Sequence, residues 1–332
     1  MNRPKVDVVV PIYNSLDWSK MCVDALIRNT NLDILGTIYL MDDASDDETK
    51  AYLDIIERKW HGLVKVIHNH TILGFTSTCN KAIRMSASDF VLLLDTSCIL
   101  SKNAIEKMMN AMLKDPKIGL LCPVSSVAAN LSFDIPEGMN YMQVNKAFGE
   151  QFSGMTFDAF TITDNCLMIS RDNINKIGLL NESFDKDYSV EIDYQFRSIA
   201  KGFKAKVLID TFVYHQSNVS LGISKNQQKI RDNNLEEFFD RLGKDYRALY
   251  KKYSENDPIK YIYKHVKFDK LNNVCSLFVT DYYEYEKLAN LVNNLVLDHV
   301  NVEVVTKERI VNKYNGILLF SPTIKKGFSL NQ

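Results

Sequence analysis

Strand and helix patterns alternate along the first 100 residues, and this alternation limits the possible folds more than any other feature. Residues 6–12 (VDVVVPI) are β-branched and almost continuously apolar, which is typical of a parallel strand buried on both faces. The same pattern returns between helical segments. We expect strands at 6–12, 37–43, 63–69 and 89–95, and helices at 16–29, 45–60 and 76–86.

This succession predicts an α/β fold with an open, mostly parallel sheet flanked by helices on both faces. Sheets of this kind bind ligands at the carboxyl ends of their strands. The second helix is expected to begin at Ser45, because Ser45 and Glu48 have the spacing of a capping box.

The middle of the chain is less regular, and the pattern restarts near its end. We expect a helix at 101–115, short strands and loops over 116–160, a strand at 166–170, a helix at 191–200 and a strand at 205–215. These observations predict a main domain over 1–240, a helical linker over 241–270 and a small C-terminal βαβ unit over 271–332. That unit has too few elements to close a domain, so we interpret it as the start of a truncated second domain.

The charge balance excludes one class of partner. Lys and Arg total 40 and Asp and Glu total 41, for a formal net charge of −1. A protein that binds nucleic acid without sequence preference normally carries a strong basic excess. We therefore expect no nucleic-acid partner.

Apolar runs and cysteines indicate the cellular compartment. No run reaches the roughly 18 apolar residues of a membrane span, and the N-terminal residues show no signal-peptide cleavage pattern. The six cysteines are scattered without zinc-binding spacing, which predicts reduced thiols. We expect a cytoplasmic protein without a transmembrane segment, and leave open its peripheral association with the inner face of the membrane.

Carboxylates stand at the ends of two predicted strands. At least one of Asp42 and Asp43 should project into the crevice, where it can accept a hydrogen bond from a uracil or thymine N–H or from ribose hydroxyls. Asp95 follows the apolar run FVLLL, where a lone buried charge would be costly. A divalent ion that carries a nucleotide diphosphate would stabilise it. The alternative for residues 41–49 is a solvated acidic turn that favours the next helix dipole.

Three other segments contain candidate residues. Residues 11–14 (PIYN) can form a platform for a flat base or an ordinary turn, and the helix that carries Asn80 follows a glycine that allows a ligand close to the backbone. Glu191 and Asp193 open a helix and point in different directions, and Asp193 has Arg197 as a surface ion-pair partner at i,i+4.

The order of these segments resembles the inverting family-2 glycosyltransferases with the GT-A fold, over roughly residues 5–240. The segments that carry the resemblance are PIYN (11–14), MDDASDDET (41–49), LGFTSTCNKAI (73–83), LLLDTS (92–97), CLMISRDNINKIGLLNESF (166–184), EIDYQFR (191–197) and FVYH (212–215).

By matching position, the resemblance implies a role for each candidate residue. The residues implied to hold the nucleotide are Pro11, Tyr13, Asn14, Asp42, Asp43, Asn80 and Asp95, with Asp43 as the preferred base contact and Asn80 as a polar contact to the nucleotide-sugar. Glu191 is implied to be the general base, with Asp193 as the second candidate. His215 matches a histidine near the metal and the diphosphate.

The chain departs from the family pattern at one position. The family usually has a second Asp where this chain has Ser97, in the sequence Asp95-Thr96-Ser97. The resemblance implies a divalent cation, Mn²⁺ or Mg²⁺, held by Asp95 and His215. Because Ser97 is a neutral and weaker ligand than the missing Asp, we expect the cation to arrive mainly with the nucleotide.

The resemblance implies transfer of a sugar from a nucleotide-sugar donor to a hydroxyl of a glycan or lipid-linked saccharide, with inversion, in surface polysaccharide or glycoconjugate synthesis. One alternative is a non-catalytic nucleotide-sugar-binding module of a larger assembly enzyme. A second is a sugar nucleotidyltransferase, which usually has a glycine-rich basic loop after the first strand. Residues 11–20 contain no glycine and only one lysine, which disfavours this second alternative.

Overall fold

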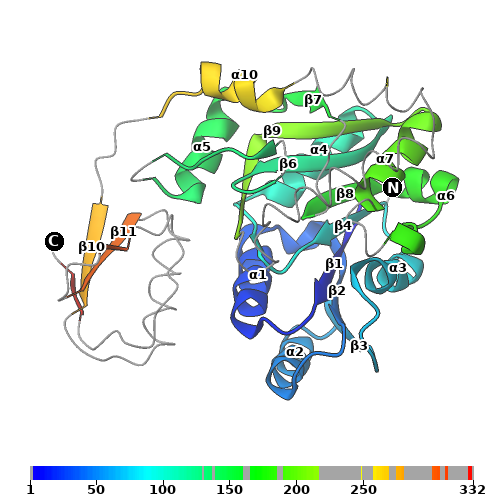
Figure 1. The fold of residues 1–332 in the computed structure, drawn as a ribbon, viewed down its shortest axis with the longest axis horizontal. Helices are drawn as coiled ribbons and strands as arrows, with labels where there is room; N and C mark the ends of the chain where they lie inside the picture. Colours follow the sequence, from blue (N-terminus) through cyan, green and yellow to red (C-terminus); the bar gives the residue numbers. More distant parts are fainter. Residues whose placement is uncertain are drawn as a thin grey trace. The chain divides into compact units, whose positions relative to one another are not determined.

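A computed structural model describes most of the N-terminal two thirds of the chain and parts of the remainder (Figure 1). The described ranges are 3–128, 131–136, 139–159, 165–184, 190–216, 248, 257–268 and the backbone of four later strands. Within these ranges, no helix is both long enough and apolar enough to cross a membrane.

Strands and helices alternate through the described part of the chain. In order, they are β1 (Val6–Ile12), α1 (Leu16–Asn29), the 3-10 helix η1 (Leu32–Ile34), β2 (Leu35–Asp42), α2 (Asp47–Lys59), β3 (Val64–His68), α3 (Phe75–Met85), β4 (Phe90–Leu94), β5 (Cys98–Ile99), α4 (Ala104–Lys114), β6 (Ile118–Ser125), α5 (Tyr141–Gln151), β7 (Thr156–Asp158), β8 (Cys166–Ser170), α6 (Arg171–Ile177), the 3-10 helix η3 (Glu182–Phe184), α7 (Val190–Ala200), β9 (Lys204–His215), α10 (Pro258–His265), β10 (Val274–Val279), β11 (Asn301–Thr306), β12 (Val311–Asn312) and β13 (Phe328–Leu330).

The main sheet has the order β3-β2-β1-β4-β8-β6-β9-β5, with β7 paired to β9. Strands β3, β2, β1 and β4 are parallel to one another, and β6 and β9 are parallel to each other. β8 runs antiparallel between β4 and β6. The sheet is thus mixed and mostly parallel, and the predicted fold class is confirmed. β1 lies between β2 and β4, so the loops after these three strands meet at one edge.

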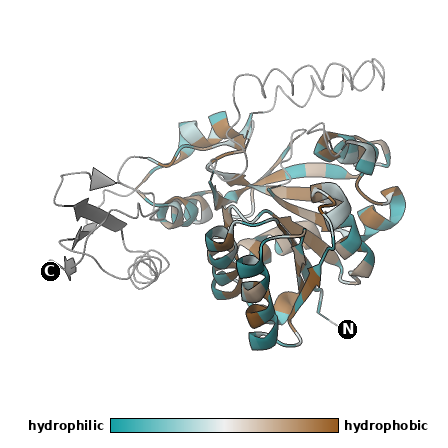
Figure 2. Ribbon diagram, turned by 60° about the horizontal axis from the view of Figure 1, so that its bottom comes forward, coloured by the Kyte–Doolittle hydropathy of each residue, from teal (hydrophilic) through white to brown (hydrophobic). Residues whose placement is uncertain are grey.

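Helices cover both faces of this sheet, because its strands are apolar on both sides. Alternate residues of β1 (Val6, Val8, Val10 and Ile12) join a buried cluster with α1 and α4. Helices α3, α6 and α7 contact strands of the same sheet, and Val9 on the other side of β1 is equally buried. In Figure 2 the central strands are mainly brown, whereas the helices carry teal residues outward.

The predicted elements of the first 100 residues are confirmed, with two differences. The N-cap of α2 is Asp46, whose side chain accepts a hydrogen bond from Thr49 N, so the predicted capping box at Ser45 is wrong. Ser45 instead accepts a hydrogen bond from Asn14 N in the neighbouring loop. The short strand β5 was not predicted.

The less regular middle also differs from expectation. Within 116–160, the structure has the eight-residue strand β6 and the eleven-residue helix α5 rather than only short strands and loops. The predicted strands at 166–170 and 205–215 and the helix at 191–200 are confirmed as β8, β9 and α7. The five cysteines with described side chains are buried and form no disulfide, in agreement with reduced thiols.

The chain forms two compact units. The first comprises 1–133 and 152–264 and contains the main sheet, and the second comprises 134–151 and 265–332. The second unit has a small sheet of order β12-β11-β10-β13 in which β10 and β11 are parallel. The helix of the predicted C-terminal βαβ unit lies outside the described residues, as does most of the predicted linker, so the division at 240 and 270 stays a prediction.

Leu92 tests the central packing of the main sheet. It is fully buried in β4, so Leu92→Ala should lower the free energy of unfolding by about 2–5 kcal/mol. Ile55→Ala on the exposed side of α2 should change it by less than about 0.5 kcal/mol. Urea denaturation of both variants checks this, and equal losses would contradict the assignment of β4 to the core.

Candidate functional site

A pocket lies where β1, β2 and β4 end and α3 begins. It is lined by Pro11, Ile12, Tyr13, Ser15, Asp43, Gly74, Phe75, Thr78, Asp95 and Thr96. The carboxyl ends of parallel strands are where open α/β sheets bind ligands. Its wall combines two aromatic rings, two carboxylates and two hydroxyl-bearing threonines, which suits a ligand with a flat apolar part and polar substituents.

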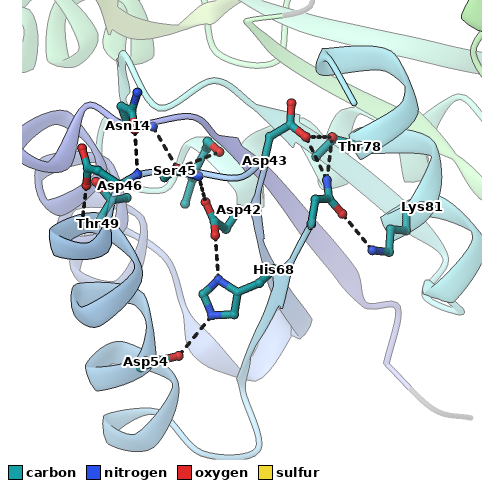
Figure 3. Close-up of polar contacts among 12 residues, drawn as sticks. Asn14, Asp42, Asp43, Ser45, Asp46, Thr49, Asp54, His68, Thr78 and Lys81 are labelled. Atoms are coloured by element: carbon teal, nitrogen blue, oxygen red, sulfur yellow. Dashed lines mark hydrogen bonds and ion pairs between the residues drawn. The ribbon is translucent and has the colours of Figure 1, made fainter. Parts of the chain in front are cut away.

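The loops after β1 and β2 are hydrogen-bonded to each other (Figure 3). Asn14 N donates to Ser45 Oγ at 2.9 Å, and Asp46 N donates to Asn14 Oδ1 at 2.8 Å. Asn14, Ser15 and Ala44 all have positive φ, a conformation that non-glycine residues rarely adopt. These contacts stabilise that conformation. They hold Tyr13 with 53% of its surface exposed at the pocket.

Asp43 anchors the N-terminus of α3. It is only 5% exposed, yet it lines the pocket. Its Oδ1 accepts hydrogen bonds from Asn69 Nδ2 (2.9 Å), Leu73 N (2.8 Å) and Thr78 Oγ1 (3.1 Å), and its Oδ2 accepts one from Gly74 N (2.9 Å). Four donors compensate the burial of the charge. Of the two oxygens, Oδ2 retains the greater capacity to accept a further bond.

Asp42 points away from this pocket and is fully buried. Its Oδ1 accepts a hydrogen bond from Ser45 N, and its Oδ2 lies 2.6 Å from His68 Nδ1. His68 Nε2 lies 3.2 Å from Asp54, so the ring bridges two carboxylates (Figure 3). Burial lowers the pKa of His68, but the hydrogen bonds to Asp42 and Asp54 outweigh it and hold the pKa above its usual 6.5.

Asp95 has one oxygen engaged and one available. Ser97 N donates to Asp95 Oδ1 at 2.7 Å, and Ser97 Oγ donates to the same oxygen. Within the described ranges, no donor contacts Asp95 Oδ2. Asp95 also lines the pocket, so this carboxylate can offer one oxygen to a ligand or a cation.

His215 ends β9 directly opposite Cys98 of β5, which brings it beside the Asp95 loop. Its Nδ1 lies 2.7 Å from Val127 O, which can only accept, so the proton is on Nδ1. The lone pair then lies on Nε2, and this buried nitrogen has no hydrogen-bond partner in the described structure. A histidine that donates one ring N–H to a backbone carbonyl and leaves the other nitrogen free has the arrangement of a metal ligand.

Asn165, which the sequence reasoning missed, connects these two residues. Its backbone oxygen accepts a hydrogen bond from Asp95 N at 2.8 Å. Its Nδ2 and His215 Nδ1 both donate to Val127 O, at 3.3 and 2.7 Å, so the two side chains share this acceptor. Asp95 and His215 are 120 residues apart in the sequence, and no local pattern marks Asn165 as the residue between them.

Asn80 is buried and does not line the pocket. Its amide donates to Leu180 O and Glu182 Oε1 and accepts from Leu180 N, at 2.8–3.0 Å. Hydrogen bonds from Asn80 and Ser77 hold the pKa of Glu182 below its usual value. Asn80 therefore fastens α3 to residues 180–182. Its predicted contact with the nucleotide-sugar stays a prediction, which this geometry does not favour.

The two acids of α7 lie in different surroundings. Asp193 is buried and pairs with Arg197 at 2.7–2.8 Å, and Arg197 also donates to Ile177 O and Leu179 O. The predicted i,i+4 pair is present, but its carboxylate is buried, whereas the Arg197 side chain is 32% exposed. Glu191 is partly exposed in the first turn of the same helix. Asp193 thus has a structural partner in Arg197, and Glu191 is the more exposed of the two acids.

The structure brings four of the predicted residues into one pocket: Pro11, Tyr13, Asp43 and Asp95. It does not place the others on that pocket's wall, namely Asn14, Asp42, Asn80, Glu191, Asp193 and His215. Sequence reasoning missed Phe75 and Thr78, although both lie in a segment that it singled out. Among the described residues, no group of three or more His, Cys, Asp or Glu could hold a metal by itself.

The His68 bridge predicts a pH-dependent stability. Because the pKa of His68 is raised in the folded state, its contribution is fully present below about pH 6.5 and is lost as pH rises through the folded pKa. The wild-type protein should be more stable than His68→Gln. The difference in their free energies of unfolding should be larger at pH 5.5 than at pH 8.5. We expect a gap below about 1 kcal/mol, because 35% of the ring is exposed. Urea denaturation at both pH values checks this, and a larger gap at pH 8.5 would contradict it.

Comparisons with known proteins agree with this geometry. The chain is 23% identical over 330 residues to a hyaluronan synthase of Pasteurella multocida, covering 92% of this chain and 32% of that protein. The chain therefore spans about a third of the length of this relative.

Two solved structures have a similar fold. One is GalNAc-T7 with UDP, GalNAc and Mn²⁺, with a TM-score of 0.55 at 17% identity over 79% of this chain and 58% of that chain. The other is the mannosyltransferase PcManGT from Pyrobaculum calidifontis with GDP-Man and Mn²⁺, with a TM-score of 0.54 at 17% identity over 73% and 66%. These neighbours are GT-A glycosyltransferases, which confirms the predicted architecture.

The family model "Glycosyl transferase family 2" matches residues 7–178. The match runs from β1 through α6 and includes the whole pocket described above. Because this match covers more than half of the chain, the chain belongs to glycosyltransferase family 2.

Proposed function

We propose that this protein transfers a sugar from a nucleotide-sugar donor to a saccharide hydroxyl with inversion of the anomeric configuration. One observation carries the proposal: the pocket at the strand ends places Tyr13, Asp43 and Asp95 on one wall. An aromatic ring and a hydrogen-bond acceptor match the face and the polar edge of the base, and a free carboxylate oxygen can hold a cation that accompanies the diphosphate.

The nucleotide is proposed to lie with its base between Tyr13 and Phe75 and its polar edge toward Asp43. Asp43 Oδ2 accepts only the Gly74 N–H among the described residues, so it can accept one more bond. A base with a ring N–H, such as uracil, supplies that donor, whereas the ring nitrogen of cytosine does not. The two similar structures, which hold UDP and GDP-Man, support a test of donors whose bases carry a ring N–H.

Asp43→Asn tests this assignment. It replaces an acceptor by a donor, so UDP affinity should fall roughly tenfold to a hundredfold, as for a buried hydrogen bond to a charged group. Asp43 also holds four protein donors, so the variant should lose stability and must be assayed where it is folded.

The neighbouring carboxylate provides the comparison. Asp42→Asn should lose stability but little UDP affinity, because Asp42 bonds Ser45 and His68 and does not line the pocket. Calorimetry distinguishes the two carboxylates. If Asp42→Asn weakens UDP binding more than Asp43→Asn does, the assignment is reversed.

A divalent cation fits the residues beside the pocket. Asp95 Oδ2 and His215 Nε2 have no partner in the described structure, and a hard oxygen with an imidazole nitrogen suits Mn²⁺. We propose that these two atoms hold Mn²⁺ or Mg²⁺ together with the diphosphate. When bound, the cation would supply charge neutralisation at the leaving diphosphate.

Glu191 is proposed to be the general base. Its carboxylate takes the proton of the acceptor hydroxyl, the acceptor oxygen forms a bond to the anomeric carbon, and the bond from that carbon to the diphosphate breaks on the opposite face. The nucleoside diphosphate leaves with the electron pair of the broken bond. The chain's task is to align both substrates and to accept one proton.

Glu191→Gln should lower turnover by about 10²–10⁴ with little change in donor affinity, because the amide keeps the size but loses the basic oxygen. Asp193→Asn is the matched comparison on the same helix. It should reduce stability through loss of the Arg197 pair more than it changes turnover at saturating substrate. Abolished transfer in Asp193→Asn with most activity kept in Glu191→Gln would reverse the two roles.

The acceptor is proposed to be a glycan or lipid-linked saccharide, as the hyaluronan synthase relative indicates for polysaccharide synthesis. The predicted cytoplasmic location stays a prediction, and peripheral association with the membrane stays open. Incubation with UDP-, GDP- and dTDP-sugars tests the function through the product released. Nucleoside diphosphate supports it, pyrophosphate would indicate a nucleotidyltransferase, and nucleotide binding without turnover on any acceptor would indicate a non-catalytic module.

A further inference from the structure

Ser97 stands where the family usually has a second carboxylate, and the structure shows what its side chain does. Ser97 is 0% exposed and does not line the pocket, although Asp95 and Thr96 do. Its backbone N–H and its hydroxyl both donate to the same oxygen, Asp95 Oδ1. Its backbone oxygen accepts a hydrogen bond from Gln216 N at 3.1 Å. The polar groups of Ser97 are therefore directed into the protein.

These bonds determine which part of Asp95 remains available. Two donors on Oδ1 fix the orientation of the carboxylate about its side-chain bonds. Oδ2 is the oxygen left without a donor in the described structure. A carboxylate held in this way offers a single oxygen in one direction, and it loses no side-chain freedom when a cation binds.

The same short segment also positions His215. Cys98 pairs with His215, and Ser97 O accepts the N–H of the next residue, Gln216. The hydroxyl of Ser97 thus acts within a segment that holds both proposed cation ligands. A small side chain suits position 97, because its hydroxyl reaches only Asp95, two residues earlier in the sequence.

We propose that Ser97 is a positioning residue: it orients Asp95 so that Oδ2 faces the cation and diphosphate, and it is not itself a ligand. This inference rests on the proposed function, since it assumes a nucleotide-bound cation at Asp95. It predicts that the chain compensates for the absent second carboxylate by pre-orienting the first one.

Ser97→Ala removes the hydroxyl and keeps the backbone N–H bond. Titration of Mn²⁺ by electron paramagnetic resonance with saturating UDP should show Mn²⁺ affinity about tenfold to a hundredfold weaker than wild type, as for other residues that hold a metal ligand. UDP affinity in EDTA should be unchanged. Ser101→Ala is the matched control, because Ser101 is equally buried and donates to Phe212 O outside the pocket. It should leave Mn²⁺ affinity unchanged.

A second variant separates positioning from direct coordination. A thiolate prefers soft cations, so Ser97→Cys would favour Cd²⁺ over Mn²⁺ if residue 97 contacted the cation. We expect the wild-type preference between these ions to be retained. A shift toward Cd²⁺ would overturn the proposal, as would Mn²⁺ affinity in Ser97→Ala equal to wild type.

Asp95→Asn distinguishes this proposal from the proposed function. Weak Mn²⁺ binding in Asp95→Asn together with normal binding in Ser97→Ala would refute the positioning role of Ser97 and leave the proposed cation site in place. Mn²⁺ binding that is the same in Asp95→Asn and wild type would show that the proposed cation site itself is wrong, and the role of Ser97 with it.

Discussion

The buried carboxylate of Asp43 is the interaction on which the pocket depends. A charge that is 5% exposed must be compensated by donors, and Asp43 obtains them from Asn69, Leu73, Gly74 and Thr78. These residues come from the end of β3 and the beginning of α3. One side chain therefore joins the second strand, the third strand and the third helix at the edge where the nucleotide is proposed to bind.

The rest of the site is built from similar short-range constraints between distant segments. The loops after β1 and β2 share hydrogen bonds through Asn14 and Ser45, and these support three residues with positive φ. Asn165 links the Asp95 loop to the end of β9 through Val127 O, which accepts from both Asn165 and His215. Because each contact bridges different strands, the pocket's shape follows from the strand order of the sheet and not from any one loop.

Burial separates the candidate residues into two groups. Asp42, Asn80 and Asp193 were singled out as polar residues beside strand ends or helix starts, which are the usual places for ligand contacts. In the structure their polar atoms are engaged by Ser45 and His68, by Leu180 and Glu182, and by Arg197. These contacts favour a structural role for each residue, and their implied roles at the ligand stay predictions, whereas Asp43, Asp95 and Tyr13 lie at the pocket itself.

The sequence by itself determined the α/β class, the first four strands with their intervening helices, and the strand-end positions of Asp43 and Asp95. These follow from periodicity and from the cost of leaving apolar strands exposed, which act over a few residues. Only the tertiary structure decided that β8 runs antiparallel in the sheet, that Asp46 caps α2, and that Asn165 lies between Asp95 and His215. Those outcomes depend on which distant donors and acceptors meet when the chain packs, and no local pattern in the sequence encodes that.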